Sequence, residues 1–318
     1  MKRLSNIYQR IISMNNLVLA DKKARKGKSD QYGVKIHDRQ RGCNLIRLQN
    51  MLIDKTYSTS GYTTFKVYEP KEREVYRLPF FPDRIVHHAI MNILESVFVA
   101  SFTADTFSCI KGRGIHAASF AVRRALRDEV QTRYCLKIDI KKYYPNVDHQ
   151  VLKVLIRRKI KDKDLLWLLD EIIDSAPGLP IGNYLSQYFA NFYLSGMDHW
   201  IKEQLGVKHY FRYLDDMVFF SADKDSLHKI LEKVKAYTAH QLKLSLKENY
   251  QVFPVQARGV DFVGYVHYHI HTSLRKSIKQ RFARMLKSNR TRASIASYNG
   301  WIQHCDGRNL FNTLTHGR

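Results

Sequence analysis

The sequence predicts an α+β fold in which helices cover one face of an antiparallel β-sheet. From residue 134 onward the apolar pattern changes in the order strand, helix, strand pair, helix, strand. The segment FRYLDDMVFF, residues 211–220, is typical of a hairpin whose two strands are both buried. The 318 residues contain no internal repeat and are enough for two or three sub-structures with a core.

The N-terminal part is expected to be helical and then to form a strand pair. Residues 1–55 are helix-rich and basic. YTTFKVYEP, residues 62–70, alternates as a strand does, and VYRLPFF, residues 75–81, is the predicted second strand after a KERE turn. The spacing of apolar residues in DRIVHHAIMNILESVF, residues 83–98, predicts a helix that buries one face.

The central part supplies the predicted sheet and the helices that cover it. YCLKIDIKKYYPNV is a predicted strand that ends near Tyr144, with Asp139 on its more polar side. Residues 149–175 are predicted to be helical, and the Gly- and Pro-containing GLPIGNY opens a loop that runs into another long helix. After the FRYLDDMVFF hairpin, the sequence predicts a helix over 226–241, a strand at 250–253 and a second hairpin over 260–268.

The C-terminal part is predicted to be an amphipathic helical section. Its apolar face carries Ile278, Phe282, Met285 and Leu286, and its opposite face carries Lys276, Lys279, Lys287 and Arg290. Taken alone, this pattern fits an ordinary surface helix and a nucleic-acid contact equally well.

The chain is strongly basic, which bears on its partners. Lys and Arg number 53 against 29 Asp and Glu, for a formal net charge of +24. A polyanion is the favoured partner, because each phosphate contact releases counterions. A generally basic protein and a membrane-surface binder remain alternatives on charge alone. No uncharged apolar stretch is long enough to cross a membrane and the N-terminus lacks a secretory pattern, so we expect a cytoplasmic protein with no membrane partner.

Asp215 and Asp216 are adjacent carboxylates at the tip of the predicted hairpin. An isolated Asp pair is usually turn chemistry, but here apolar strands on both sides make the carboxylates project from rigid elements. Asp139 adds a third carboxylate from the other core strand. Three acids that converge in a low dielectric repel one another unless a cation is present, so we expect a divalent metal.

Paired divalent cations held by shared carboxylates are suited to in-line displacement at phosphorus. Mg²⁺ takes few protein carboxylates together with substrate phosphates, which suits a site of three acids; Mn²⁺ is the expected substitute. With the basic excess, the pattern predicts a nucleotidyl transferase with two Mg²⁺ ions.

Five segments between residues 76 and 270 resemble, in order, the motif series of reverse transcriptases: RLPFFPDRIVHHAI and CIKGRGIHAASFAV (fingers), KIDIKKYYPNVDH (palm strand), YLDD (a variant of the Tyr-x-Asp-Asp box) and DFVGY (primer-grip hairpin). The resemblance implies a right-hand polymerase fold with fingers, an antiparallel-sheet palm and a short helical thumb. The implied domains are 1–75 (basic extension and start of the fingers), 76–133 (fingers), 134–270 (palm, with a helical segment at 149–180) and 271–318 (helical thumb).

The resemblance also implies roles for single residues. Asp139 and Asp215 would be the principal metal ligands, helped by the Ile140 carbonyl, with Asp216 completing the acidic cluster. Tyr144, five positions after Asp139, falls at the steric gate, an aromatic ring under the deoxyribose that would clash with a 2′-hydroxyl. A plain core aromatic is the alternative for Tyr144.

Further implied contacts involve the triphosphate, the primer and the template. Arginine suits a forked contact with phosphate, and glycine lets a primer backbone approach closely. The implied nucleotide contacts are Arg77, Lys111, Arg113, Tyr144, Ile181 and Gln187, and the implied primer and template contacts are Gly264, Lys276, Lys279, Lys287 and Arg290. Many relatives carry a lysine for pyrophosphate protonation near the position of Tyr250; here either Lys247 substitutes or that assistance is absent.

The segment GLPIGNYLSQYFANFYL resembles one subfamily in particular. Most reverse transcriptases have Pro-Gln-Gly where this chain has Pro180-Ile181-Gly182, and the pattern Ile-Gly-x-x-x-Ser-Gln resembles the reverse transcriptases of diversity-generating retroelements. Those enzymes, encoded by bacteria, archaea or phages, make cDNA that is error-prone at template adenines. The loss of an amide at Ile181 is expected to weaken discrimination, unless Gln187 restores the contact.

The subfamily implies an RNA template made from a template repeat, a DNA or RNA primer, deoxynucleoside triphosphates and a small basic oligomeric accessory protein. Rival functions stay open at this stage. A retron or group II intron reverse transcriptase would have ordinary, base-independent errors, and a defence-associated polymerase would extend products without added template. A non-catalytic RNA-binding protein on the same fold is the rival outside enzymes.

Overall fold

The computed structural model describes residues 3–68, 72–288 and 291–316, and it divides into two compact units. The first unit comprises residues 1–102, 142–196 and 242–244, and the second comprises 103–141, 197–241 and 245–318. The units therefore interleave along the chain, whereas the four segments expected from the sequence are consecutive.

The first unit begins with the predicted helix-rich segment. Helices pack here through fully buried apolar side chains such as Leu17, Leu48, Leu52 and Ile90. Because each helix is short and buries one stripe, its stability comes from packing rather than from intrinsic propensity. The helices are α1 (Tyr8–Ile12), α2 (Met14–Ala24), α3 (Tyr32–Arg39), α4 (Arg41–Ile53) and α5 (Ile85–Val99).

The predicted strand pair of the first unit is present, with shifted bounds. β1 (Thr63–Val67) pairs with β2 (Arg73–Arg77) in antiparallel register. The prediction that the second strand covers residues 75–81 was wrong at both ends. Pro79 has no N–H for a strand ladder, and a short helical turn, Phe80–Arg84, follows and leads into α5.

The segment predicted as one helix over 149–175 forms two, α7 (His149–Lys159) and α8 (Lys163–Ile173). The break has a local cause. The Asp162 carboxylate caps α8 by accepting from Leu165 N at 3.2 Å, and it also accepts from Ile7 N at 2.7 Å. Ile160 is extended and forms a bridge with Leu4. The next helix, α9 (Tyr184–His199), follows the predicted loop.

A four-stranded antiparallel sheet forms the centre of the second unit, in the order β4-β5-β3-β6. Its strands are β3 (Tyr134–Asp139), β4 (His209–Tyr213), β5 (Asp216–Ser221) and β6 (Gln251–Pro254). β3 ends at Asp139 and not near Tyr144 as expected, because the chain turns after the Ile140–Leu246 bridge and Lys142 takes a positive φ of 44°. The strand end therefore coincides with the first acidic residue.

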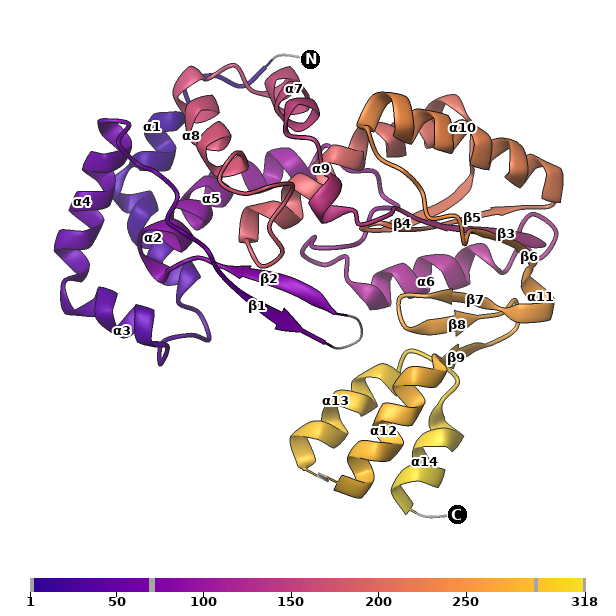
Figure 1. The fold of residues 1–318 in the computed structure, drawn as a ribbon. Helices are drawn as coiled ribbons and strands as arrows, with labels where there is room; N and C mark the ends of the chain where they lie inside the picture. Colours follow the sequence, from indigo (N-terminus) through magenta and orange to yellow (C-terminus); the bar gives the residue numbers. More distant parts are fainter. Residues whose placement is uncertain (1–2, 69–71, 289–290, 317–318) are drawn as a thin grey trace. The chain divides into compact units, whose positions relative to one another are not determined.

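Helices lie on both sides of this sheet, so the expectation of helices on one face was wrong (Figure 1). α6 (Ile115–Ala125) packs its small residues Ala118 and Val122 in one buried cluster with Cys135 and Val218. α10 (Lys224–Leu242) lies on the opposite side. The strands alternate, so each sends large apolar side chains to both faces and needs cover on both.

The rest of the second unit is a three-stranded sheet followed by a helical section. β7 (Val260–Phe262), β8 (Tyr265–His267) and β9 (Thr272–Leu274) pair antiparallel after α11 (Val255–Arg258), and α12 (Lys276–Ser288), α13 (Arg292–Ile302) and α14 (Arg308–His316) follow. The predicted apolar face of α12 packs around the fully buried Phe282 with Ile278, Met285 and Leu286. In the described ranges, no helix is both long enough and apolar enough to span a membrane.

Candidate active site

Strand pairing brings the three aspartates together in the second unit. Asp139, the last residue of β3, stands directly opposite Asp216, the first residue of β5. Asp215 lies in the tight turn between β4 and β5, where Leu214 has a positive φ of 54°. Asp139 and Asp216 are thus fixed by the backbone ladder, and Asp215 is fixed by the tight turn that joins β4 to β5.

Two lysines partly neutralise this acidic cluster. Lys247 Nζ forms an ion pair with Asp139 Oδ2, and Lys247 N donates to the Asp139 carbonyl at 2.8 Å. Lys137 Nζ lies 3.4 Å from Asp216 Oδ2. Burial and then the charge of Asp139 raise the pKa of Asp215 to about 6, and burial also raises the pKa of Asp216. Both pKa values are raised even though the two lysines are present, so the ionised forms of these carboxyl groups remain destabilised. A further cation would stabilise the ionised forms.

The carboxylate oxygens fit a hard divalent cation. Asp139 Oδ1 and Asp216 Oδ1 are buried and accept no hydrogen bond from the part of the chain that the structure describes. Across the described residues, no group of three or more His, Cys, Asp and Glu side chains is arranged so that it could hold a metal ion by itself. Mg²⁺ matches such an open arrangement, because it keeps waters and substrate phosphates among its ligands.

A buried ion pair behind the hairpin was not predicted from the sequence. Arg212 on β4 and Asp198 both have fully buried side chains, and the guanidinium contacts the carboxylate through Nε at 2.8 Å and Nη2 at 2.5 Å. Arg212 Nη1 also donates to the Leu214 carbonyl at 3.1 Å. The pair therefore holds the turn that presents Asp215. An arginine in an apolar strand signals a buried partner, but it does not reveal which acid that is.

Lys137 was also missed, although the sequence held a signal for it. It precedes Asp139 by two positions on β3, so the alternation of a strand places both side chains on one face. Lys247 was predicted as one of two alternatives for a lysine near Tyr250, and the structure places it directly on Asp139.

Among the contacts of the described residues, none joins the other predicted residues of the second unit to the three carboxylates. Lys111 is exposed in a turn and Arg113 donates from Nη1 to the Thr103 carbonyl at 2.9 Å. Gly264, with φ +91°, lies between β7 and β8, and a Cβ there would lie 2.5 Å from the Trp301 ring. Packing against Trp301 is thus one reason for this glycine. Lys276 and Lys287 are exposed on α12, Lys279 is half-buried, and Arg290 lies outside the described residues.

The first unit holds the remaining predicted residues. Arg77 is exposed at the end of β2, and Tyr144 and Ile181 are half-buried. Gln187 lines a cavity of about 310 Å³ together with Lys23, Lys26, Lys28, Arg84 and His88. Burial and the charges of Lys28 and Lys23 lower the pKa of His88 to about 4. None of the described residues that line this cationic cavity is acidic, so it favours an anionic ligand.

Comparison with known proteins identifies the family and the fold of the chain. The sequence model described as reverse transcriptase (RNA-dependent DNA polymerase) matches residues 69–267, more than half of the chain. The chain belongs to the reverse transcriptase family. Members of this family use divalent metal ions, in keeping with the open carboxylate site. The predicted right-hand polymerase fold is confirmed by apo telomerase from Candida tropicalis, with a TM-score of 0.50 over 77% of this chain and 57% of that chain at 13% identity, which shows the fold alone.

Several curated relatives of this chain come from bacteria. The Group II intron-encoded protein LtrA of Lactococcus lactis subsp. cremoris is 28% identical over 39% of this chain and 22% of its own length. Retron Ec73 reverse transcriptase of Escherichia coli is 24% identical over 74% of this chain and 82% of its own length. Protein YkfC of Escherichia coli is 26% identical over 44% of this chain. The chain spans less than half of the length of YkfC and LtrA, 41% and 22%.

Proposed function

We propose that this chain is an RNA-directed DNA polymerase, which extends a DNA or RNA primer on an RNA template with deoxynucleoside triphosphates. The observation that carries the proposal is the alignment of Asp139, Asp215 and Asp216 at one end of two paired strands in a reverse transcriptase fold. When bound there, divalent cations activate the attacking 3′-hydroxyl and stabilise the leaving pyrophosphate.

Protein residues would supply orientation and charge around that chemistry. Asp139 and Asp216 offer the two buried oxygens that lack partners, and Asp215 adds a carboxylate whose ionised form is destabilised by its surroundings. Lys247, which pairs with Asp139, is the group that we assign to protonation of pyrophosphate, in place of a lysine near Tyr250. The Ile140 carbonyl completes the proposed ligand set.

Basic surfaces in each unit support nucleic-acid binding. In the first unit, we assign the cationic cavity beside Gln187 to template phosphates and Arg77 to the triphosphate. In the second unit, Lys111 and Arg113 would also face the triphosphate, and Gly264 and the α12 lysines would contact the primer and template. In the proposed polymerase, residues 76–133 would form the fingers, 134–270 the palm and 271–318 the thumb. The enzyme would act in the cytoplasm, where RNA and nucleotides are present.

The finer proposal is that the cDNA is error-prone at template adenines, as in a diversity-generating retroelement. Support comes from Ile181, which stands where most relatives have a glutamine. Its carbonyl accepts from Tyr76 N at 2.7 Å, so the backbone at this position is anchored on β2. An apolar side chain makes no hydrogen bond to the incoming nucleotide, and unmade bonds weaken discrimination. This role would include a template-repeat RNA and a basic accessory protein.

Ile181→Gln is expected to lower misincorporation opposite adenine by about two- to tenfold, the effect of one net hydrogen bond of about 0.5–1.5 kcal/mol. Sequencing of cDNA made by the variant and by the unchanged chain measures it. Ile181→Leu is the control, because it keeps the position apolar and is expected to leave the error rate unchanged. Equal error rates for all three proteins would move the cause of infidelity elsewhere.

A second candidate is a retron or group II intron reverse transcriptase of ordinary fidelity. It is favoured by the similarity to Retron Ec73 reverse transcriptase over most of that protein's length. The two candidates separate in one assay: Mg²⁺-dependent extension on a primed RNA of balanced base composition, with cDNA errors sorted by template base. We expect errors concentrated opposite adenine. Evenly spread errors would support the second candidate, and no extension with any primer and template tested would overturn the polymerase assignment.

A further inference from the structure

The loop between α8 and α9, residues 174–183, involves two positions with an expected role in nucleotide selection. It carries Ile181 itself. It also contacts the backbone of Tyr144, because Leu179 N donates to the Tyr144 carbonyl at 2.8 Å. All of these residues belong to the first unit. We call this segment the α8–α9 loop.

Gly178 lets the α8–α9 loop approach Tyr144 more closely than any other residue could. Its φ is +60°, and a Cβ at this position would lie 2.5 Å from the carbonyl oxygens of both Tyr144 and Pro145. Both atoms are backbone, so they cannot swing away as a side chain would. The glycine is therefore in direct backbone contact with the short helical turn, Tyr144–Asn146, that contains the aromatic residue.

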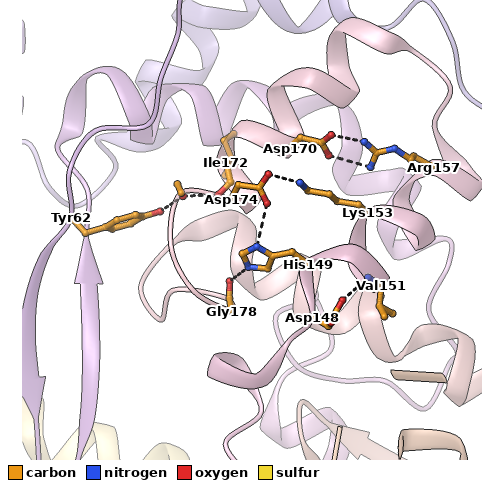
Figure 2. Close-up of polar contacts among 11 residues, drawn as sticks. Tyr62, Asp148, His149, Val151, Lys153, Arg157, Asp170, Ile172, Asp174 and Gly178 are labelled. Atoms are coloured by element: carbon orange, nitrogen blue, oxygen red, sulfur yellow. Dashed lines mark hydrogen bonds and ion pairs between the residues drawn. The ribbon is translucent and has the colours of Figure 1, made fainter. Parts of the chain in front are cut away.

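His149, at the start of α7, ties the α8–α9 loop to the segment that follows Tyr144 (Figure 2). Its Nε2 lies 2.8 Å from the Gly178 carbonyl, and its Nδ1 lies 3.2 Å from Asp174 Oδ1. Lys153, one turn further along α7, also pairs with Asp174. A carbonyl only accepts, so Nε2 must donate; both contacts are hydrogen bonds when the ring is protonated on both nitrogens.

The α8–α9 loop is also attached to Tyr62, the residue before β1, and to β2. Tyr62 Oη lies 2.8 Å from Ser175 Oγ and accepts from Asn183 Nδ2 at 2.8 Å. A Cβ on Gly182 would lie 2.4 Å from the Tyr76 carbonyl, so here too backbone packs on backbone. The loop is thus held at several points along its length, which makes it a rigid support rather than a free connection.

We propose that the α8–α9 loop, through Gly178 and the His149–Asp174 pair, positions Tyr144 and thereby sets the selection of deoxyribonucleotides over ribonucleotides. The inference rests on the proposed function together with the steric-gate role that the resemblance to reverse transcriptases implies for Tyr144. A steric clash excludes the 2′-hydroxyl of a ribonucleotide only if the Tyr144 ring stays in place. A displacement of the ring by about 1 Å would relieve the clash. His149 and Gly178 are positioning residues, because they act through Tyr144.

The test compares kcat/KM for dGTP and GTP on a primed RNA template with the full chain. Gly178→Ala and His149→Ala are expected to lower the dGTP/GTP ratio by about tenfold or more, chiefly by raising kcat/KM for GTP, which corresponds to about 1.4 kcal/mol. His149→Gln should restore part of the ratio, because its amide can donate to the Gly178 carbonyl. General loss of folding would lower both values without this shift in ratio.

Asp170→Asn is the matched control. Asp170 pairs with Arg157 between the same two helices, α8 and α7, but among the contacts of the described residues the two side chains make no hydrogen bond to the α8–α9 loop (Figure 2). The Asp170 carbonyl accepts from Asp174 N at 2.9 Å, a backbone bond that the substitution keeps. The variant removes a comparable ion pair and is expected to leave the ratio unchanged. A fall in the ratio equal to that of His149→Ala would mean that any loosening of α7 and α8 suffices, and would overturn the specific role of the loop.

Tyr144→Ala separates a failure of the inference from a failure of the proposed function. If Tyr144→Ala admits GTP while Gly178→Ala and His149→Ala keep the normal ratio, the loop does not position the gate. If Tyr144→Ala leaves the ratio unchanged, the gate assignment itself is wrong and the inference falls with it. Should Gly178→Ala fail to fold, as judged by circular dichroism, the His149 variants decide the outcome.

Discussion

Asp215→Asn is expected to lower kcat/KM for Mg²⁺-dependent primer extension by at least about 100-fold, or about 2.7 kcal/mol of transition-state stabilisation. The substitution removes one carboxylate from the acidic cluster while keeping the size of the side chain. It also removes a charge that is repelled by Asp139, since burial and Asp139 raise the pKa of Asp215. The folded protein should therefore be at least as stable as before, and loss of extension would not reflect unfolding.

Two measurements make this result specific. RNA binding, followed by a filter assay, should be nearly unchanged, because phosphate contacts by lysine and arginine do not depend on this carboxylate. Asp225→Asn, the same change at an exposed residue of α10, should keep full extension. Full extension by Asp215→Asn would reject the assignment of Asp215 as a metal ligand.

The second large effect is on stability: Asp198→Ala is expected to lower the free energy of unfolding by about 3–5 kcal/mol. Arg212 and Asp198 are fully buried, and Tyr210 Oη and Thr106 Oγ1 also donate to the carboxylate at 2.7 and 3.0 Å. Loss of the carboxylate leaves a buried guanidinium without its counter-charge and two hydroxyl donors without their acceptor. Urea unfolding followed by circular dichroism measures the change.

Glu232→Ala is the control for that measurement. Glu232 pairs with Lys235 at 3.0 Å on α10, and its side chain is 70% exposed. Exposed pairs contribute little, so we expect a loss below about 1 kcal/mol. If Asp198→Ala shifted the unfolding midpoint no more than Glu232→Ala does, the buried pair would not be what holds the turn before Asp215.

Local patterns account for most of what could be predicted. The strands on either side of YLDD were predictable because large apolar residues follow one another in short runs, and the acidic cluster followed from the end of β3 and the adjacent hairpin. The two errors in the sheet region had tertiary causes. β3 stops at Asp139 because the chain turns after Ile140 bridges to Leu246, which lies more than 100 positions away. The alternation of the strands showed that both faces of the sheet are apolar, but it could not show that α10 covers one of them.

The predicted nucleotide contacts show the limit of transfer by motif. Arg77, Tyr144, Ile181 and Gln187 belong to the first unit, whereas Lys111 and Arg113 belong to the second. Their common role in nucleotide binding stays a prediction. The basic composition predicted cationic surfaces, but it did not predict that the cavity beside Gln187 would gather Lys23 and Lys28 from the N-terminal segment.

By itself, the sequence determined the family and the acidic residues, because motifs are short and their order along the chain is visible. Tertiary structure alone decided which groups act on those residues. Lys247 pairs with Asp139, Asp198 holds Arg212, and His149 reaches the Gly178 carbonyl. Each of these contacts joins groups that lie apart in the sequence and that packing brings together. Such a pair produces no periodic pattern in the sequence, so it could not be predicted from the sequence.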